Sequence, residues 1–155
     1  MKFKAQVENL LNNALEENPR LFLIELNFTE DNKIKIILDG DDSVSLSDCV
    51  KVSRAIEHNL DRDVTDFGLE VSSVGANEPL INIRQYLKNI GRKLSINDVT
   101  KKKHEGVLKS VNDSEILIEW KERQPKKIGK GKETVLKNKI LSFSEITQSK
   151  VILKF

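Results

Sequence analysis

Few side chains in this sequence belong to the types that carry out nucleophilic or metal-dependent chemistry. The chain has one cysteine, Cys49, and two histidines, His58 and His104. Cys49 falls on an apolar stripe with no basic neighbour to lower its pKa, which indicates a packed thiol and not a nucleophile. A zinc site needs about four ligands, and these three residues are scattered along the chain. The sequence therefore predicts no catalytic residue, no metal and no cofactor, and it favours a protein that is not an enzyme.

Two short motifs look like ligand-binding loops but lack residues that such loops require. The run Asp39-Gly-Asp-Asp-Ser-Val-Ser begins like a calcium loop. An EF-hand frame starting at Asp39 needs glycine where Val44 stands and glutamate where Val50 stands. The run Gly129-Lys-Gly-Lys-Glu-Thr is rich in glycine and lysine but does not have the spacing of a P-loop. We interpret the first run as a solvated turn and the second as a flexible basic loop.

Basic side chains gather in two predicted loops. Three consecutive lysines occupy one loop, and Lys121, Arg123 and several lysines crowd the other. Such clusters neutralise phosphates and release counterions, although a solvated lysine-rich surface is the alternative interpretation. An aromatic content of 5% argues against a platform that stacks single-stranded bases, so contacts to RNA backbone and shape are expected. The candidate RNA-contacting residues are Lys101, Lys102, Lys103, Lys126, Lys127, Lys130 and Lys132.

Charge is distributed unevenly along the chain. The whole sequence of 155 residues carries a formal net charge of +2. Residues 1–80 hold 8 basic and 16 acidic side chains, whereas residues 81–155 hold 18 basic and 8 acidic ones. Such a split predicts two units with different partners, the second suited to an anionic surface such as nucleic acid. The acidic first part would be repelled by RNA, which favours a basic protein as its partner.

Several classes of protein are disfavoured by the composition. No apolar run approaches the ~18 residues that a membrane-spanning helix needs. The first residues form a mixed polar and apolar pattern, unlike a signal peptide. A single cysteine cannot form a disulfide within the chain. We therefore expect a cytoplasmic protein with no membrane partner and no small-molecule substrate.

The elements that would position these side chains differ between the two parts. Over residues 3–15, apolar residues recur at helical spacing, and Pro19 ends the helix. Residues 21–28 alternate, with Phe22, Ile24, Leu26 and Phe28 on one side, and they predict an antiparallel hairpin with residues 34–38. A second helix capped by Ser47 and a strand over 67–72 follow. The order αββαβ predicts an α+β domain over residues 1–83, with both helices on one face of a small sheet.

Short strands with polar turns characterise the remainder of the chain. We expect an all-β domain over residues 84–155, preceded by a short helix or packed linker near residue 86. Five short strands in such a length are typical of a small, curled β-barrel. The expected strands are Arg92–Ile96, Gly106–Val111, Glu115–Trp120, a stretch near Thr134–Lys137, and Lys150–Phe155.

Particular stretches resemble the bacterial family of ribosome maturation factors called RimP. The likeness covers nearly the whole chain and is most specific over residues 36–80. Two positions depart from the family pattern, which commonly has proline where Val74 stands and a basic residue where Glu78 stands. The matching stretches are Ile36–Gly40, Val44–Ile56, Asn59–Asp61, Leu69–Gly75, Glu78–Leu80, Gly91-Arg92, Glu105–Leu108 and Ile116–Ile118.

The resemblance implies an N-terminal α/β domain and a C-terminal Sm-like or SH3-like barrel, without enzymatic activity. It implies binding to the free small (30S) ribosomal subunit, at rRNA and the basic ribosomal protein of the decoding centre. We expect a monomer that assists subunit maturation; the alternative is an Sm-like regulator acting on mRNA or small RNA. The candidate protein-contacting residues are Asp39, Asp41, Asp42, Ser72, Ser73 and Gly75.

Overall fold

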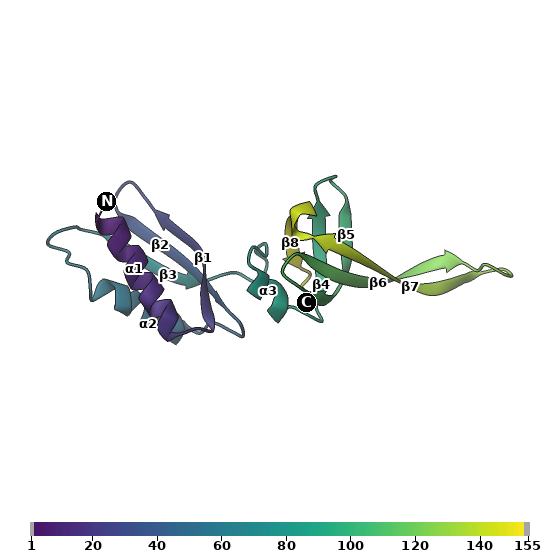
Figure 1. The fold of residues 1–155 in the computed structure, drawn as a ribbon, viewed down its shortest axis with the longest axis horizontal. Coiled ribbons are helices and arrows are strands. Elements are labelled where there is room, and N and C mark those ends of the chain that lie inside the picture. The colour runs from purple at the N-terminus through teal and green to yellow at the C-terminus, as the bar shows by residue number, and fades with distance from the viewer. Residues whose placement is uncertain (1, 154–155) are drawn as a thin grey trace. The chain divides into compact units, whose positions relative to one another are not determined.

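The computed structural model describes residues 2–153 and separates the chain into two compact units (Figure 1). The first unit is Met1–Gly75 and the second is Ala76–Phe155. The division falls between Gly75 and Ala76, ahead of the boundary expected after residue 83. By sequence, the first unit holds 8 basic and 15 acidic side chains, and the second holds 18 basic and 9 acidic ones. The opposite charges therefore belong to separate folded units.

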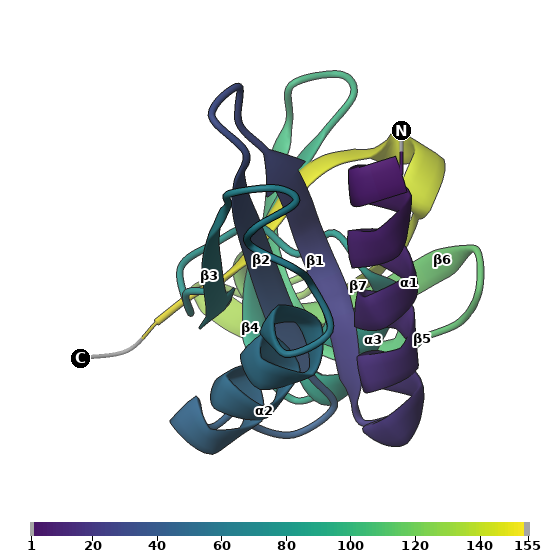
Figure 2. The same cartoon turned by 90° about the vertical axis from the view of Figure 1, so that its left-hand side faces the viewer.

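The first unit is a three-stranded sheet with two helices, in the αββαβ order that the sequence predicts. Strands β1 and β2 are antiparallel, and β3 joins the free edge of β2 in parallel. Both helices cover the same face of this sheet (Figure 2). A parallel neighbour requires a crossover, and α2 supplies it. The elements are α1 (Lys2–Glu17), β1 (Leu21–Phe28), β2 (Lys33–Gly40), α2 (Leu46–Glu57) and β3 (Gly68–Ser73).

A β-bulge in β1 changes which of its residues face the helices. The register with β2 shifts between Leu23 and Glu25, so Ile24 is the extra residue. Leu21 and Leu23 before the bulge, and Leu26 and Phe28 after it, pack with the helix-side core. The predicted single row of Phe22, Ile24, Leu26 and Phe28 is therefore wrong at its first two members. A prediction that assumes unbroken alternation does not detect one extra residue in a strand, and that residue moves the preceding side chains to the other face.

Helix α2 begins two residues earlier than predicted because Ser45, not Ser47, is its N-cap. The Ser45 hydroxyl accepts a hydrogen bond from the Asp48 N–H at 3.1 Å, and the Asp48 carboxylate accepts from the Ser45 N–H at 2.9 Å. This reciprocal pair is a capping box, which satisfies two backbone donors at the helix start. The helix then directs Val52 and Ile56, both 0% exposed, into the core of the first unit.

The second unit is a five-stranded antiparallel sheet with the strand order β7-β6-β5-β4-β8. All five expected strands are present, but the last one covers Ile146–Val151 and not Lys150–Phe155, of which Lys154 and Phe155 lie outside the described residues. Closure into an Sm-like or SH3-like barrel stays a prediction. The elements are α3 (Ile83–Lys88), β4 (Lys93–Asp98), β5 (Lys103–Val111), β6 (Glu115–Pro125), β7 (Lys132–Ser142), a 3₁₀ turn (Phe143–Glu145) and β8 (Ile146–Val151).

The core of this unit consists of inward-facing aliphatic side chains from β4, β5, β6 and β7, covered by Tyr86 of α3. The Tyr86 hydroxyl donates to Ser149 Oγ at 2.8 Å, and its ring meets that of Phe143 edge-on with centroids 5.1 Å apart. The hydroxyl groups of Tyr86 and Ser149, which are buried away from water, are hydrogen-bonded to each other in this way. The core residues are Tyr86, Leu94, Ile96, Leu108, Ile116, Ile118 and Leu141.

Strands β6 and β7 are longer than the sequence pattern predicts. In the part of the chain that the structure describes, β5 partners β6 no further than Glu119, whereas β6 and β7 pair as far as Pro125 and Lys132. Residues 120–137, which we call the distal hairpin, therefore form a two-stranded ribbon that extends beyond the other strands (Figure 1). The sequence pattern does not reveal this extension, because neither face of the hairpin is fully buried and polar residues occupy both faces.

Candidate nucleic-acid interface

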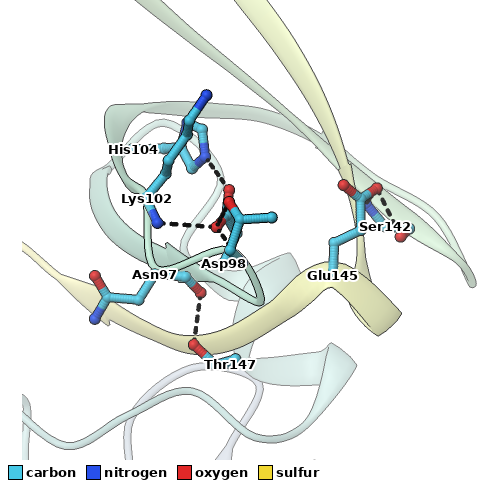
Figure 3. Close-up of polar contacts among 8 residues, drawn as sticks. Asn97, Asp98, Lys102, His104, Ser142, Glu145 and Thr147 are labelled. Atoms are coloured by element: carbon cyan, nitrogen blue, oxygen red, sulfur yellow. Dashed lines mark hydrogen bonds and ion pairs between the residues drawn. The ribbon is translucent and has the colours of Figure 1, made fainter.

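The three consecutive lysines lie where a tight connection from β4 enters β5. Asp98 organises this connection, and Figure 3 shows its contacts with Lys102 and His104. Asp98 Oδ1 accepts hydrogen bonds from the N–H of Thr100 at 2.9 Å and of Lys102 at 3.0 Å. It also accepts from the Thr100 hydroxyl at 2.6 Å. Its second oxygen, Oδ2, lies 2.7 Å from His104 Nε2. One carboxylate thus fixes the path of the backbone that carries the lysines.

The environment of Asp98 keeps this carboxylate ionised. Its pKa is held well below the usual range, first by the Thr100 hydroxyl, next by His104, and further by the backbone N–H groups of Lys102 and Thr100, while desolvation opposes them. Hydrogen bonds to the charged form favour ionisation in this way. Asp98 is only 8% exposed, so it is an internal anchor of the turn and not a surface carboxylate that repels phosphate.

The lysines of this turn are not equivalent. Lys101 has a left-handed backbone with φ of 69°, a conformation that is unfavourable for a residue with a side chain. Lys103 begins β5, and its ammonium lies 3.3 Å from Glu105. All three lysines are exposed. We call Lys101, Lys102 and Lys103 the lysine turn. Its first two members project from the turn itself, and the third is part of a strand with a carboxylate beside it.

The second basic group lies on the distal hairpin. Lys126, Lys127 and Lys130 occupy its tip, and Lys132 begins β7. The expectation that Lys121 and Arg123 share that loop is wrong, because both are strand residues of β6. Gly129 and Gly131 have φ of 89° and 96°, which lets the tip turn tightly without side-chain strain. All the basic residues named here are exposed. The candidate RNA-contacting lysines therefore form two groups on one unit, at different strand connections.

The acidic candidates occupy the connection after β2 in the first unit. Asp41 and Asp42 are exposed, but Asp39 is 4% exposed and its carboxylate accepts the Gly40 N–H at 2.8 Å. Ser72 and Ser73 end β3, where Ser72 pairs with Ile37 of β2, and Gly75 follows in an exposed position. The structure thus places Asp41 and Asp42 on the surface and Asp39 in the interior.

Arg20 contacts the same acidic connection, which sequence reasoning missed. Its guanidinium lies 3.1 Å from the Asp42 carboxylate and 2.5 Å from that of Asp48, and it donates to the Ser43 carbonyl at 2.9 Å. The pKa of Asp48 is lowered to about 2, first by the Ser45 backbone N–H and then by Arg20. No local sequence pattern indicates these contacts of Arg20, because its partners are more than twenty residues away in the sequence. The acidic surface is accordingly partly neutralised.

The remaining reactive side chains are dispersed. Cys49 is buried, and burial raises the pKa of its thiol. His58 is an exposed residue at the end of α2. Within residues 2–153 no three His, Cys, Asp or Glu side chains come together in a way that would hold a metal ion. Within the same range, no helix has the length and apolar character needed to cross a membrane.

Comparison with known proteins identifies relatives along the full length. A family model, the RimP N-terminal domain, matches residues 10–77. The chain is 50% identical over 155 residues to the ribosome maturation factor RimP of Flavobacterium psychrophilum, covering 100% of both chains. It is 50% identical to the RimP of Christiangramia forsetii over 98% of this chain and 99% of that one, and 32% identical to that of Cytophaga hutchinsonii over 99% and 98%. The chain therefore belongs to the RimP family of ribosome maturation factors.

Proposed function

We propose that this protein is a non-enzymatic factor that binds the free small (30S) ribosomal subunit in the cytoplasm and assists its maturation. The observation that carries the proposal is the full-length identity of 50% with chains named ribosome maturation factor. The charge separation between the two units supports it, because a ribosomal particle offers both RNA phosphates and basic proteins. We further propose that the protein acts as a monomer.

The basic second unit is the proposed rRNA-binding part. Its lysine turn and the hairpin-tip lysines present exposed cations from two strand connections. Phosphates neutralised by such side chains release counterions, which gives sequence-independent and salt-sensitive affinity. The rigid anchor at Asp98 reduces the entropy that the lysine turn would lose on binding. The five-stranded sheet is proposed to close as an Sm-like or SH3-like barrel, a scaffold that would hold both connections in place.

The acidic first unit is the proposed partner of the basic ribosomal protein at the decoding centre. Asp41 and Asp42 supply the exposed carboxylates, and Ser72, Ser73 and Gly75 supply a nearby strand end. Asp39 shapes this connection from within. Two weak contacts made by one chain reinforce each other, because the first raises the effective concentration for the second. An assembly factor that divides its contacts between two units in this way can bind the subunit well and still dissociate, because each contact is weak by itself.

Sedimentation of a cell extract through a sucrose gradient tests the proposal. The protein is expected to migrate with free small subunits and not with complete ribosomes. Absence from every ribosomal fraction at low salt, together with capture of free mRNA or small RNA, would instead identify an RNA regulator. The variant Asp41→Asn/Asp42→Asn is expected to migrate less with subunits than Asp63→Asn/Asp66→Asn, which removes the same charge from exposed positions of the same unit.

A further inference from the structure

The distal hairpin has two chemically different faces. Side chains alternate along a strand, and cross-strand partners point to the same side. Glu122 is opposite Val135 and Gln124 is opposite Glu133, so both carboxylates of the hairpin share one side. We call this side the carboxylate face; its members are Trp120, Glu122, Gln124, Glu133, Val135 and Lys137. The other side, the cation face, carries Lys121, Arg123, Pro125, Lys132, Thr134 and Leu136.

Glu122 is held on its own face. Its carboxylate accepts hydrogen bonds from Trp120 Nε1 at 3.1 Å and from Gln124 Nε2 at 3.0 Å, and both donors belong to the same side of β6. These bonds, that of Trp120 first, lower the pKa of Glu122 and keep it charged. Neighbouring side chains of a strand point to opposite faces, so the Glu122 carboxylate points away from Lys121 and Arg123 and does not pair with them. The separation of charge is therefore built into the hairpin.

The cation face is suited to phosphates and not to bases. Among residues 120–137 it carries no acidic and no aromatic side chain, and its exposed apolar residue is Leu136, at 56% exposure. Lys121 and Arg123 are two residues apart on one strand, which places their stems about 7 Å apart on the same side of β6. Proteins that bind single strands stack bases on aromatic rings, whereas duplex RNA is recognised through its shape, phosphates and 2′-hydroxyls. A row of cations without aromatic side chains matches the second case.

We propose that the cation face lies along the phosphate backbone of double-stranded RNA, with Lys121, Arg123 and Lys132 as the contacting residues. In the assembly role proposed above, on which this identification rests, the duplex is a helix of the small-subunit rRNA. The carboxylate face then points away from the phosphates. The hairpin is thus a one-sided arm, and its strand residues, besides the tip lysines, determine how it is oriented on the RNA.

Two double variants of the full chain test this orientation. Lys121→Gln/Arg123→Gln removes two charges from the cation face. Lys137→Gln/Lys139→Gln removes two from the opposite side, since residue 139 follows 137 by one strand repeat. Binding to a short RNA duplex of mixed sequence is measured against salt concentration for the wild type and both variants. The cation-face variant is expected to lower the slope of log affinity against log salt by about 2, while the control leaves it near the wild-type value.

The outcomes separate this inference from the assembly role. Equal slopes for the two variants, tighter binding to the separated single strand, or no binding of wild type to the duplex at low salt would each overturn it. Co-sedimentation of the wild type with small subunits is measured in parallel. If it occurs while the slopes are equal, the assembly role stands and the one-sided arm does not. If it fails while the slopes differ, the arm stands and the assembly role does not.

Discussion

His104 Nε2 lies 2.7 Å from Asp98 Oδ2. A residue near the start of β5 therefore holds in place the carboxylate of the residue that ends β4. An ionised carboxylate only accepts hydrogen bonds, so His104 donates to it through Nε2. Both side chains are largely enclosed, at 13% and 10% exposure. The lysine turn is closed at its base by this contact, and we expect its stability to depend on the charge of Asp98.

Replacing Asp98 by asparagine tests that dependence through pH. A carboxylate whose pKa is lower in the folded than in the unfolded chain stabilises the fold above the unfolded value of about 3.9. That contribution is lost as pH falls toward the folded pKa. The difference in unfolding free energy between wild type and Asp98→Asn is therefore expected to be largest near neutral pH and to shrink below about pH 4. Urea unfolding followed by Trp120 fluorescence measures it, because the single tryptophan belongs to the second unit. A constant difference from pH 7 to pH 3 would show that the charge of Asp98 is immaterial.

Replacing Lys101 by glycine separates stability from binding. Its left-handed backbone costs roughly 1 kcal/mol that glycine does not incur. We expect Lys101→Gly to unfold at the same or a higher urea concentration than wild type, while its affinity for the small subunit falls. Lys102→Gly is the matched control: Lys102 does not have a positive φ, so glycine there is expected to lower stability by about 0.5–1 kcal/mol. A loss of stability in Lys101→Gly would refute the strain argument.

The capping box of α2 gives a prediction confined to the first unit. Ser45→Ala removes the hydroxyl that accepts the Asp48 N–H and is expected to cost about 1 kcal/mol. Far-ultraviolet circular dichroism follows this unit because it contains the two long helices. Ser47→Ala, at an exposed position within the helix, should be neutral or slightly stabilising, because alanine favours the helix more than serine does. Equal losses for the two variants would argue against Ser45 as the cap.

Gly106 of β5 lies against the backbone of Glu119 in β6. A Cβ atom at this position would lie 3.0 Å from the backbone oxygen of Glu119, a tighter contact than most Cβ atoms make, so the strands would have to shift slightly. Gly106→Ala is expected to destabilise the second unit by about 1–3 kcal/mol, as measured by Trp120 fluorescence in urea. For Gly68→Ala in the first unit the nearest atom is a flexible Lys33 carbon at 3.6 Å, so circular dichroism should show a much smaller loss. A neutral Gly106→Ala would mean that the two strands can move apart.

The arrangement of the first unit follows from apolar periodicity, but its irregularities do not. Ile34, Ile36 and Leu38 alternate and are fully buried, as a half-buried strand requires. An alternating pattern does not reveal the bulge at Ile24, because every residue from Leu21 to Ile24 is apolar and either face could be the buried one. Ser45 and Ser47 are chemically equal candidates for the cap. Only the backbone geometry distinguishes them.

The sequence predicts which basic residues form the candidate interface, but it does not predict the contacts that position them. The lysine runs are evident in the sequence, and the structure places them at two strand connections. The anchoring role of Asp98 depends on a contact with His104 across a turn, which no motif records. Arg20 likewise reaches Asp42 through tertiary folding. The faces of the distal hairpin required the register of β6 with β7, since the expected strand ended at Trp120.

The strand pairings also set the order in which the chain can fold during synthesis. In the first unit, β3 completes the sheet at Ser73, before the division at Gly75. In the second, β4 pairs with β8, so Leu94 meets Val151, a residue far from it in sequence. Contacts between residues so distant in sequence form late, because the loop between them must first close. The acidic unit can thus fold while the ribosome is still translating the basic one, and the five-stranded sheet can be completed only after Val151 has been synthesised and has left the ribosome.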